Sequence, residues 1–212
     1  TDTGSALFQT ADEYERLVAN PIRDEEEMTK RQLVAAETQR GAIRLSQVNP
    51  DSDPTDSVGG VSFRHLSMLA QIKSSDGDVW SSLNRSGHIE GDPSDSLRVR
   101  LARMRSWIGG AHFPEDAKLE IRSEIGDDAR AEIGRDGIAF LRILSGLLSE
   151  CEWTDAGIGE SISEACDSTG FSRKEGFSSI YWAVIGRRHG PKASSLLFEM
   201  DRGDIVSLLG SS

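Results

Sequence analysis

The stretch Gly176–Met200 constrains the fold most, because it combines an apolar run, a sharp break and a new helix start. The apolar residues of Phe177–Ile185 favour a helix, and Gly186 is typical of a helix end. The basic run Arg187–His189 follows at once. Gly190–Lys192 contains a proline, which favours a second helix start with a lysine in its first turn. The sequence therefore predicts a helix, a basic corner and a second helix.

The charge of the chain is unevenly distributed. It has 24 Lys and Arg against 35 Asp and Glu, a formal net charge of -11. Residues 171–212 hold six of these bases and four of these acids, so this tail carries +2 and the remainder carries −13. A negative body argues against a general nucleic-acid or anionic-membrane binder, because attraction of phosphate needs positive potential. A local basic patch is still compatible with this distribution.

The length and composition favour a globular chain made of short helices. The 212 residues suffice for one large or two small domains, and 37% hydrophobic with 28% charged residues favours a much-interrupted core. No apolar run is long enough for a membrane span and no signal peptide is recognisable, so we expect a cytoplasmic location. The start at Thr1, without methionine, is compatible with a piece of a longer protein. Cys151 and Cys166 form no CxxC pair, so we expect free thiols.

Apolar spacing and capping residues predict an all-α fold, a multi-helix bundle or cage of roughly ten helices with little or no strand. Two subdomains are expected, an N-terminal helical subdomain over 1–110 with a solvated loop at 49–60, and a C-terminal bundle over 111–212. A helix opened by Asp24–Glu27, with an apolar stripe that is interrupted at Gly41, is expected in the first subdomain. The other expected helices cover 11–18, 63–72, 76–87, 97–107, 127–151, 156–169, 173–185, 193–200 and 202–209.

Several polar patterns leave two interpretations open. Asp51, Asp53 and Asp56 are compatible with a calcium loop but lack the glycine and glutamate placement of an EF-hand. His65 is either a satisfied surface histidine or a ligand, although no partner stands at a matching spacing. The basic residues within 98–105 form either a solvated face that pairs with acids or a phosphate-contacting surface.

No convincing catalytic set is present in the sequence. It contains no GxSxG, P-loop, GxGxxG or HExxH motif, and the four histidines are scattered. Acidic pairs are expected by chance in so acidic a chain. The residues alone therefore indicate an all-α binding module rather than an enzyme, with no catalytic and no metal-binding residues.

Two motifs in a fixed order carry a family resemblance. The first is Phe177–Gly186 followed by Gly190–Ala193, an aromatic-x-x-Ile-Tyr helix, a basic turn and a Gly-Pro-Lys restart. The second is Val61–Leu66 followed by Leu69–Ile72, a Phe-Arg-His-Leu segment leading to Ala-Gln-Ile. Together they resemble the C-terminal part of class I lysyl-tRNA synthetases, with Ser62 where that family has proline.

The resemblance extends from about residue 30 to the C-terminus. Ser195–Phe198 and Asp204–Leu209 resemble the two closing helices of that family, and Ser106-Trp107 stands where the family has Asn-Trp. The catalytic HIGH-type and KMSKS-type motifs have no counterpart in this sequence. The chain is therefore similar to the tRNA-recognition half of such an enzyme, an all-helical anticodon-binding cage.

The resemblance implies the partner and the cofactors. We expect the chain to bind the anticodon stem-loop of tRNA(Lys), as a monomer, with no DNA and no membrane partner. We expect no cofactor in this chain; ATP with Mg would act in the catalytic domain of the parent enzyme, a lysine–tRNA ligase. The candidate tRNA-binding residues are Arg187, Arg188, His189, Lys192, Arg64 and His65.

Other interpretations remain open at this point. Tyr181 and Trp182 are either stacking faces for bases or core residues of their helix. The chain is alternatively a free-standing, synthetase-derived helical module that binds protein or RNA without catalysis. The equivalent region of a glutamyl-tRNA synthetase is a further reading, which the Phe-Arg-His-Leu and Gly-Pro-Lys segments fit less well.

Overall fold

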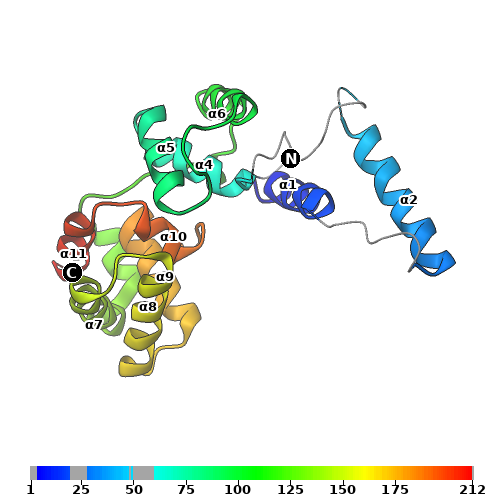
Figure 1. Ribbon diagram of the computed structural model, residues 1–212. Coiled ribbons are helices and arrows are strands. Elements are labelled where there is room, and N and C mark those ends of the chain that lie inside the picture. The colour runs from blue at the N-terminus through cyan, green and yellow to red at the C-terminus, as the bar shows by residue number, and fades with distance from the viewer. Residues whose placement is uncertain (1–3, 20–27, 48, 50–59, 212) are drawn as a thin grey trace. The chain divides into compact units, whose positions relative to one another are not determined.

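The computed structural model describes residues 4–19, 28–47, 49 and 60–211. These residues form ten α-helices and one short 3₁₀ helix and contain no strand, which confirms the all-α prediction (Figure 1). Contacts divide the chain into two compact units, Thr1–Lys118 and Leu119–Ser212, here called the N-terminal unit and the C-terminal unit. The expected division into subdomains over 1–110 and 111–212 stays a prediction.

The N-terminal unit has a core enclosed by three short helices. Its elements are α1 (Gly4–Ala19), α2 (Lys30–Leu45), α4 (Phe63–Ile72), α5 (Asp76–Arg85), α6 (Asp95–Ile108) and the 3₁₀ helix η2 (Glu115–Ala117). The helices α4, α5 and α6 bury one apolar face each, because their apolar residues recur at helical spacing. The buried residues are Val61, Leu66, Leu69, Ala70, Val79, Leu83, Leu97, Leu101 and Met104.

Serine caps explain why these three helices begin where they do. The side chains of Ser62, Ser75 and Ser94 each accept a hydrogen bond from the backbone N–H three residues later. Such a cap satisfies one of the helix N–H groups that have no partner within the helix. The start of each helix is therefore determined by local chemistry, which is visible in the sequence.

The helix α2 differs from its prediction at its start. It begins at Lys30, where Thr29 and Gln32 form a capping box, and Met28 and Thr29 precede it as non-helical residues. The expected start at Asp24–Glu27 lies outside the described residues. The break in the apolar stripe at Gly41 leaves the helix intact, because α2 continues through this residue to Leu45. A glycine within a helix costs only about 1 kcal/mol, which the surrounding turns can carry.

The C-terminal unit is organised around one long helix. Its elements are α7 (Asp127–Glu150), α8 (Asp155–Thr169), α9 (Arg173–Ile185), α10 (Ala193–Phe198) and α11 (Arg202–Gly210). The helix α7 packs against α8, α9 and α11 (Figure 1). Its side chains Phe140, Leu141, Leu144 and Leu148 are fully buried. Each of them contributes roughly 1.5–3 kcal/mol of hydrophobic burial, so this helix supplies much of the core of the unit.

One glycine breaks the regular geometry of α7. Gly134 has φ 69 and ψ 175, which is non-helical, so two helical segments meet at a kink. The helix predicted over 127–151 is confirmed as α7, and the kink at Gly134 was not part of that prediction. Glycine adopts positive φ without the steric penalty of a Cβ, which makes the break possible at this residue.

The remaining expectations concern a loop and possible ligands. The loop at 49–60 lies almost entirely outside the described residues, and its three aspartates lie outside them altogether. Among the described residues, no helix combines the length and apolarity needed to cross a membrane, and no group of three or more His, Cys, Asp or Glu side chains is placed to hold a metal ion.

Candidate nucleic-acid interface

The basic corner begins where α9 ends. Gly186 has φ 63 and ψ 30, in the left-handed region, and its N–H donates to the carbonyl of Trp182. The N–H of Arg187 donates to Tyr181 O at 3.5 Å. This αL termination satisfies the last carbonyls of the helix and turns the chain away from its axis. The helix end predicted at Gly186 is confirmed, and the basic corner begins directly after this residue.

The missing side chain of Gly186 leaves room for a guanidinium. A Cβ at this position would lie 2.3 Å from Nε and Nη2 of Arg122. Arg122 makes a two-pronged pair with Asp128, with Nη1–Oδ1 at 2.9 Å and Nη2–Oδ2 at 2.7 Å. Hydrogen bonds from Arg122 hold the pKa of the Asp128 carboxyl at about 2. This cation is therefore neutralised within the fold, although it lies beside the corner.

A cavity of 830 Å³ extends along α9 from its first turn to the corner. The axial rise of a helix gives this part of α9 a length of roughly 20 Å. The cavity is lined by Glu132, Ile133, Phe171, Ser172, Arg173, Lys174, Glu175, Phe177, Ser178, Ser179, Tyr181, Arg188, His189 and Gly190. The structure thus brings two of the predicted site residues, Arg188 and His189, into one concave surface with residues that the sequence analysis did not select.

Cations lie at both ends of this cavity. Arg173 and Lys174 occupy the first turn of α9, and Arg188 and His189 follow its last turn; all four residues are exposed. Basic residues in a first helical turn oppose the macrodipole, which favours acids there. That unfavourable placement is the feature of the sequence from which Arg173 and Lys174 can be identified as functional candidates.

The acidic residues of the cavity offset this charge in part. Glu175 is the third helical residue of α9 and accepts hydrogen bonds from the backbone N–H and hydroxyl of Ser172. The hydrogen bond from the Ser172 side chain lowers the pKa of Glu175. Glu132 is the other acid in the lining. The Glu175 carboxylate keeps its negative charge in this cap. The lining therefore holds three cations, Arg173, Lys174 and Arg188, against two acids, a net charge of +1 with histidine neutral.

Aromatic side chains also line the cavity. Phe171 and Phe177 are half-buried lining residues, and Phe171 stacks on Phe140 with ring centroids 5.6 Å apart. Tyr181 also lines the cavity, and its hydroxyl donates to Pro191 O at 2.5 Å. Trp182 is half-buried and lies outside the lining. Of the two aromatic residues considered for stacking, only Tyr181 thus faces the cavity.

Lys192 has a structural contact of its own. It is the N-cap residue of α10 rather than part of its first turn, and its ammonium pairs with Asp155. Asp155 also accepts a hydrogen bond from the Ser195 hydroxyl at 2.8 Å. Burial raises the pKa of Asp155, but hydrogen bonds from Lys192, Ser195 and Ser194 outweigh it and keep the pKa low. Lys192 lies outside the lining of the cavity.

Arg64 and His65 belong to the N-terminal unit. Arg64 Nε lies 2.5 Å from Asp12 Oδ2, and its guanidinium covers the Phe8 ring at 5.2 Å. His65 stacks on His88 with ring centroids 4.6 Å apart. These contacts place both residues among neighbours of their own unit. The six predicted site residues therefore divide between two separate units.

The cavity along α9 thus brings basic, acidic and aromatic side chains together on one concave surface. The chain is similar in sequence to archaeal lysine–tRNA ligases, which confirms the resemblance found from its motifs. It is 26% identical to that of Pyrococcus horikoshii over 176 residues (78% of this chain, 32% of the relative). Identity is 27% to that of Methanopyrus kandleri (92% and 35%) and 24% to that of Pyrococcus furiosus (98% and 39%).

The chain spans about a third of the length of these relatives. No family model matches it. The sequence similarity to the ligases, and not a family model, therefore relates the chain to tRNA synthetases.

Proposed function

We propose that this chain is the tRNA-recognition region of a lysine–tRNA ligase and binds the anticodon stem-loop of tRNA(Lys). Attachment of lysine with ATP and Mg would take place on a catalytic domain outside this sequence. The cavity along α9, which is lined by aromatic rings and by basic residues from both ends of the helix, is the observation that carries the proposal. The similarity to lysine–tRNA ligases supports tRNA(Lys) as the RNA.

The chemistry of a single-stranded loop suits this cavity. Loop bases are unstacked, so they can stack on aromatic faces, and their phosphates can pair with guanidinium and ammonium groups. Phe177 and Phe171 provide the apolar faces, while Arg173 and Arg188 lie toward opposite ends. A cavity about 20 Å long accommodates several nucleotides rather than one, because the rise of α9 separates its two ends.

The experiment is a binding titration over a salt series. Fluorescence anisotropy of labelled tRNA(Lys), and of the same tRNA with its anticodon replaced, is measured with the full chain from low to physiological salt. The test variant replaces Arg173, Lys174 and Arg188 by glutamine. We expect a loss of affinity of at least tenfold at low salt, and a log–log salt slope smaller by about 2, because each lost single-strand phosphate contact removes about 0.7.

A matched variant tests whether the position of the removed positive charges matters, and not only their number. Arg31, Arg98 and Arg103 are exposed arginines of the N-terminal unit, and replacing them by glutamine removes the same charge. This control is expected to keep the wild-type slope. Equal losses in both variants would contradict the assignment to α9. Equal binding of tRNA(Lys) and the anticodon-replaced tRNA would leave RNA binding in place and refute anticodon recognition.

A further inference from the structure

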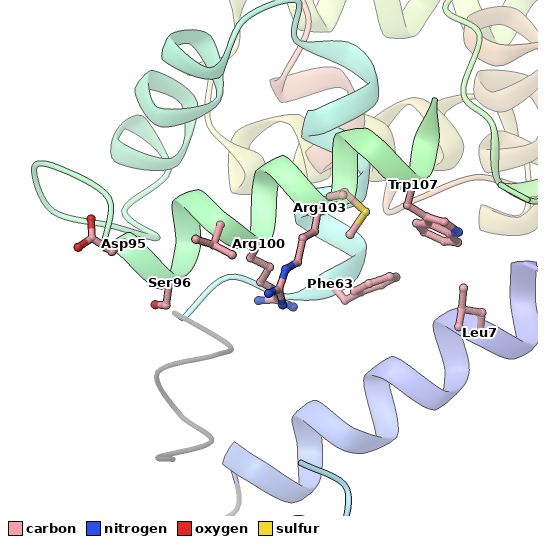
Figure 2. Close-up of a pocket in the computed structure, with 9 residues that line it drawn as sticks. Leu7, Phe63, Asp95, Ser96, Arg100, Arg103 and Trp107 are labelled. Atoms are coloured by element: carbon pink, nitrogen blue, oxygen red, sulfur yellow. The ribbon is translucent and has the colours of Figure 1, made fainter. Parts of the chain in front are cut away.

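A second, apolar groove runs along α6 in the N-terminal unit (Figure 2). Its volume is 740 Å³. Figure 2 shows Leu7 on α1 facing Phe63 and Trp107, with Arg100 and Arg103 of α6 directed to the same side. The groove is lined by Leu7, Phe63, Asp95, Ser96, Val99, Arg100, Arg103, Met104 and Trp107.

The lining of this groove is exposed and long. Val99 is 48% exposed and Leu7 is 41% exposed, and the rings of Phe63 and Trp107 lie 5.9 Å apart. The lining follows one face of α6 from Ser96 to Trp107, about three helical turns or roughly 16 Å. Phe63 and Trp107 are partly buried, whereas Leu7 and Val99 are exposed. Exposed aliphatic side chains in a continuous apolar groove are typical of interaction surfaces.

The two arginines of the groove have different surroundings. Arg100 Nη2 pairs with Glu15 Oε1 at 2.7 Å, and Arg100 Nη1 donates to Val61 O at 2.6 Å, so this guanidinium is engaged within the fold. Arg103 is exposed, and it has no ion-pair partner within the part of the chain that the structure describes. Asp95 lies at the start of α6, at one end of the groove. The positive charge left for a ligand is therefore centred on Arg103.

This charge distribution favours a peptide over RNA. RNA affinity needs several uncompensated cations, whereas Glu15 offsets Arg100 and Asp95 further lowers the local charge. We propose that the groove binds an amphipathic helical segment of a partner protein. Its apolar side chains would pack on Val99, Phe63 and Leu7, at the helical spacing by which such segments dock in grooves. An acidic side chain of the segment would pair with Arg103.

The test uses a displayed peptide library against the full chain. Each peptide is a three-to-four-turn helix with varied apolar residues on one face and Glu, Lys, Gln or Ala elsewhere. Binders are selected on the wild type and counter-selected on Val99→Asp. We expect enrichment of sequences with more Glu than Lys, and the best synthetic peptide should lose at least tenfold in affinity to Val99→Asp. Ile143→Asp, at an aliphatic residue of the C-terminal unit that is 40% exposed, should leave it unchanged.

Charge reversal on α6 has its own matched control. Arg103→Glu should weaken binding of the acidic peptide by about fivefold, which is the upper end of the range for an exposed ion pair. Arg98→Glu makes the same change outside the groove lining and should leave the affinity as it is. Circular dichroism checks that both variants keep their helices.

Four results would overturn the inference. They are a library that yields no Val99-dependent binder, equal effects of Arg98→Glu and Arg103→Glu, displacement of the peptide by a short single-stranded RNA, and self-association of the chain that Val99→Asp abolishes. The third result would assign the groove to RNA and the fourth to a second copy. None of these measurements depends on tRNA binding along α9.

Discussion

Replacing Gly186 by alanine tests the geometry that connects α9 to the basic corner. The residue has φ 63 and ψ 30, and an alanine in this region costs about 1–2 kcal/mol of backbone energy. Its Cβ would also lie 2.3 Å from the Arg122 guanidinium, which must shift from its place beside Gly186 and so disturbs its pair with Asp128. We therefore expect Gly186→Ala to lower the free energy of unfolding by more than the backbone cost alone.

The assay is urea unfolding followed by circular dichroism, arranged as a double-mutant cycle. Gly186→Ala is measured in the wild type and in an Arg122→Ala background, where only the backbone cost should remain. The two changes should couple by at least about 0.5 kcal/mol, as residues in contact do. Gly186→Asn adds the same Cβ but adopts the left-handed region more readily, so it should cost less than alanine.

Two results would refute this reasoning. If Gly186→Ala unfolds at the same urea concentration as the wild type, the left-handed termination of α9 is wrong. If the cycle is additive, Arg122 does not occupy the space beside Gly186. The two outcomes are independent, so the backbone and the side-chain parts of the argument are judged separately.

Two further predictions concern charged contacts. The Asp128 carboxyl should titrate with a pKa of about 2 in carbon-detected NMR, below the ordinary value of 3.8. Arg122→Gln should raise this pKa. Because this pKa is lowered in the folded state, the pair stabilises fully above pH 3.8 and the contribution is lost as pH falls through about 2. Glu15 Oε1 accepts from Phe63 N–H at 2.6 Å and pairs with Arg100. Glu15→Ala should therefore cost about 1–3 kcal/mol in urea unfolding, while Glu13→Ala, at an exposed neighbour, should cost little.

The helix ends could be predicted largely from the sequence, because caps act through near neighbours. Thr154 and Ser172 cap α8 and α9, and Gly170 ends α8 with φ 71, in agreement with the helices expected over 156–169 and 173–185. The kink at Gly134 was not predictable in the same way. A glycine inside an apolar helical pattern is compatible with continuous helix, and its positive φ depends on how the two segments of α7 pack.

The candidate site could be predicted only in part. Arg188 and His189 stood out because a basic run in an acidic tail is visible by composition. Arg173 and Lys174 are separated from them by the whole of α9, and only the folded helix places both pairs along one cavity. The pairing of Lys192 with Asp155 joins residues far apart in sequence, so no local pattern revealed it.

The fold gives the cations of this acidic protein different roles. Arg64, Arg122 and Lys192 each pair with an aspartate, so they add little to the potential that a polyanion meets. Lys174 and Arg188 have no acidic partner among the described residues and line the α9 cavity. With a net charge of -11, most of the surface repels a polyanion, and attraction is confined to places where cations outnumber acids. Such repulsion weakens misplaced contacts, so under the proposed function an acidic body would favour a specific position for the RNA along α9.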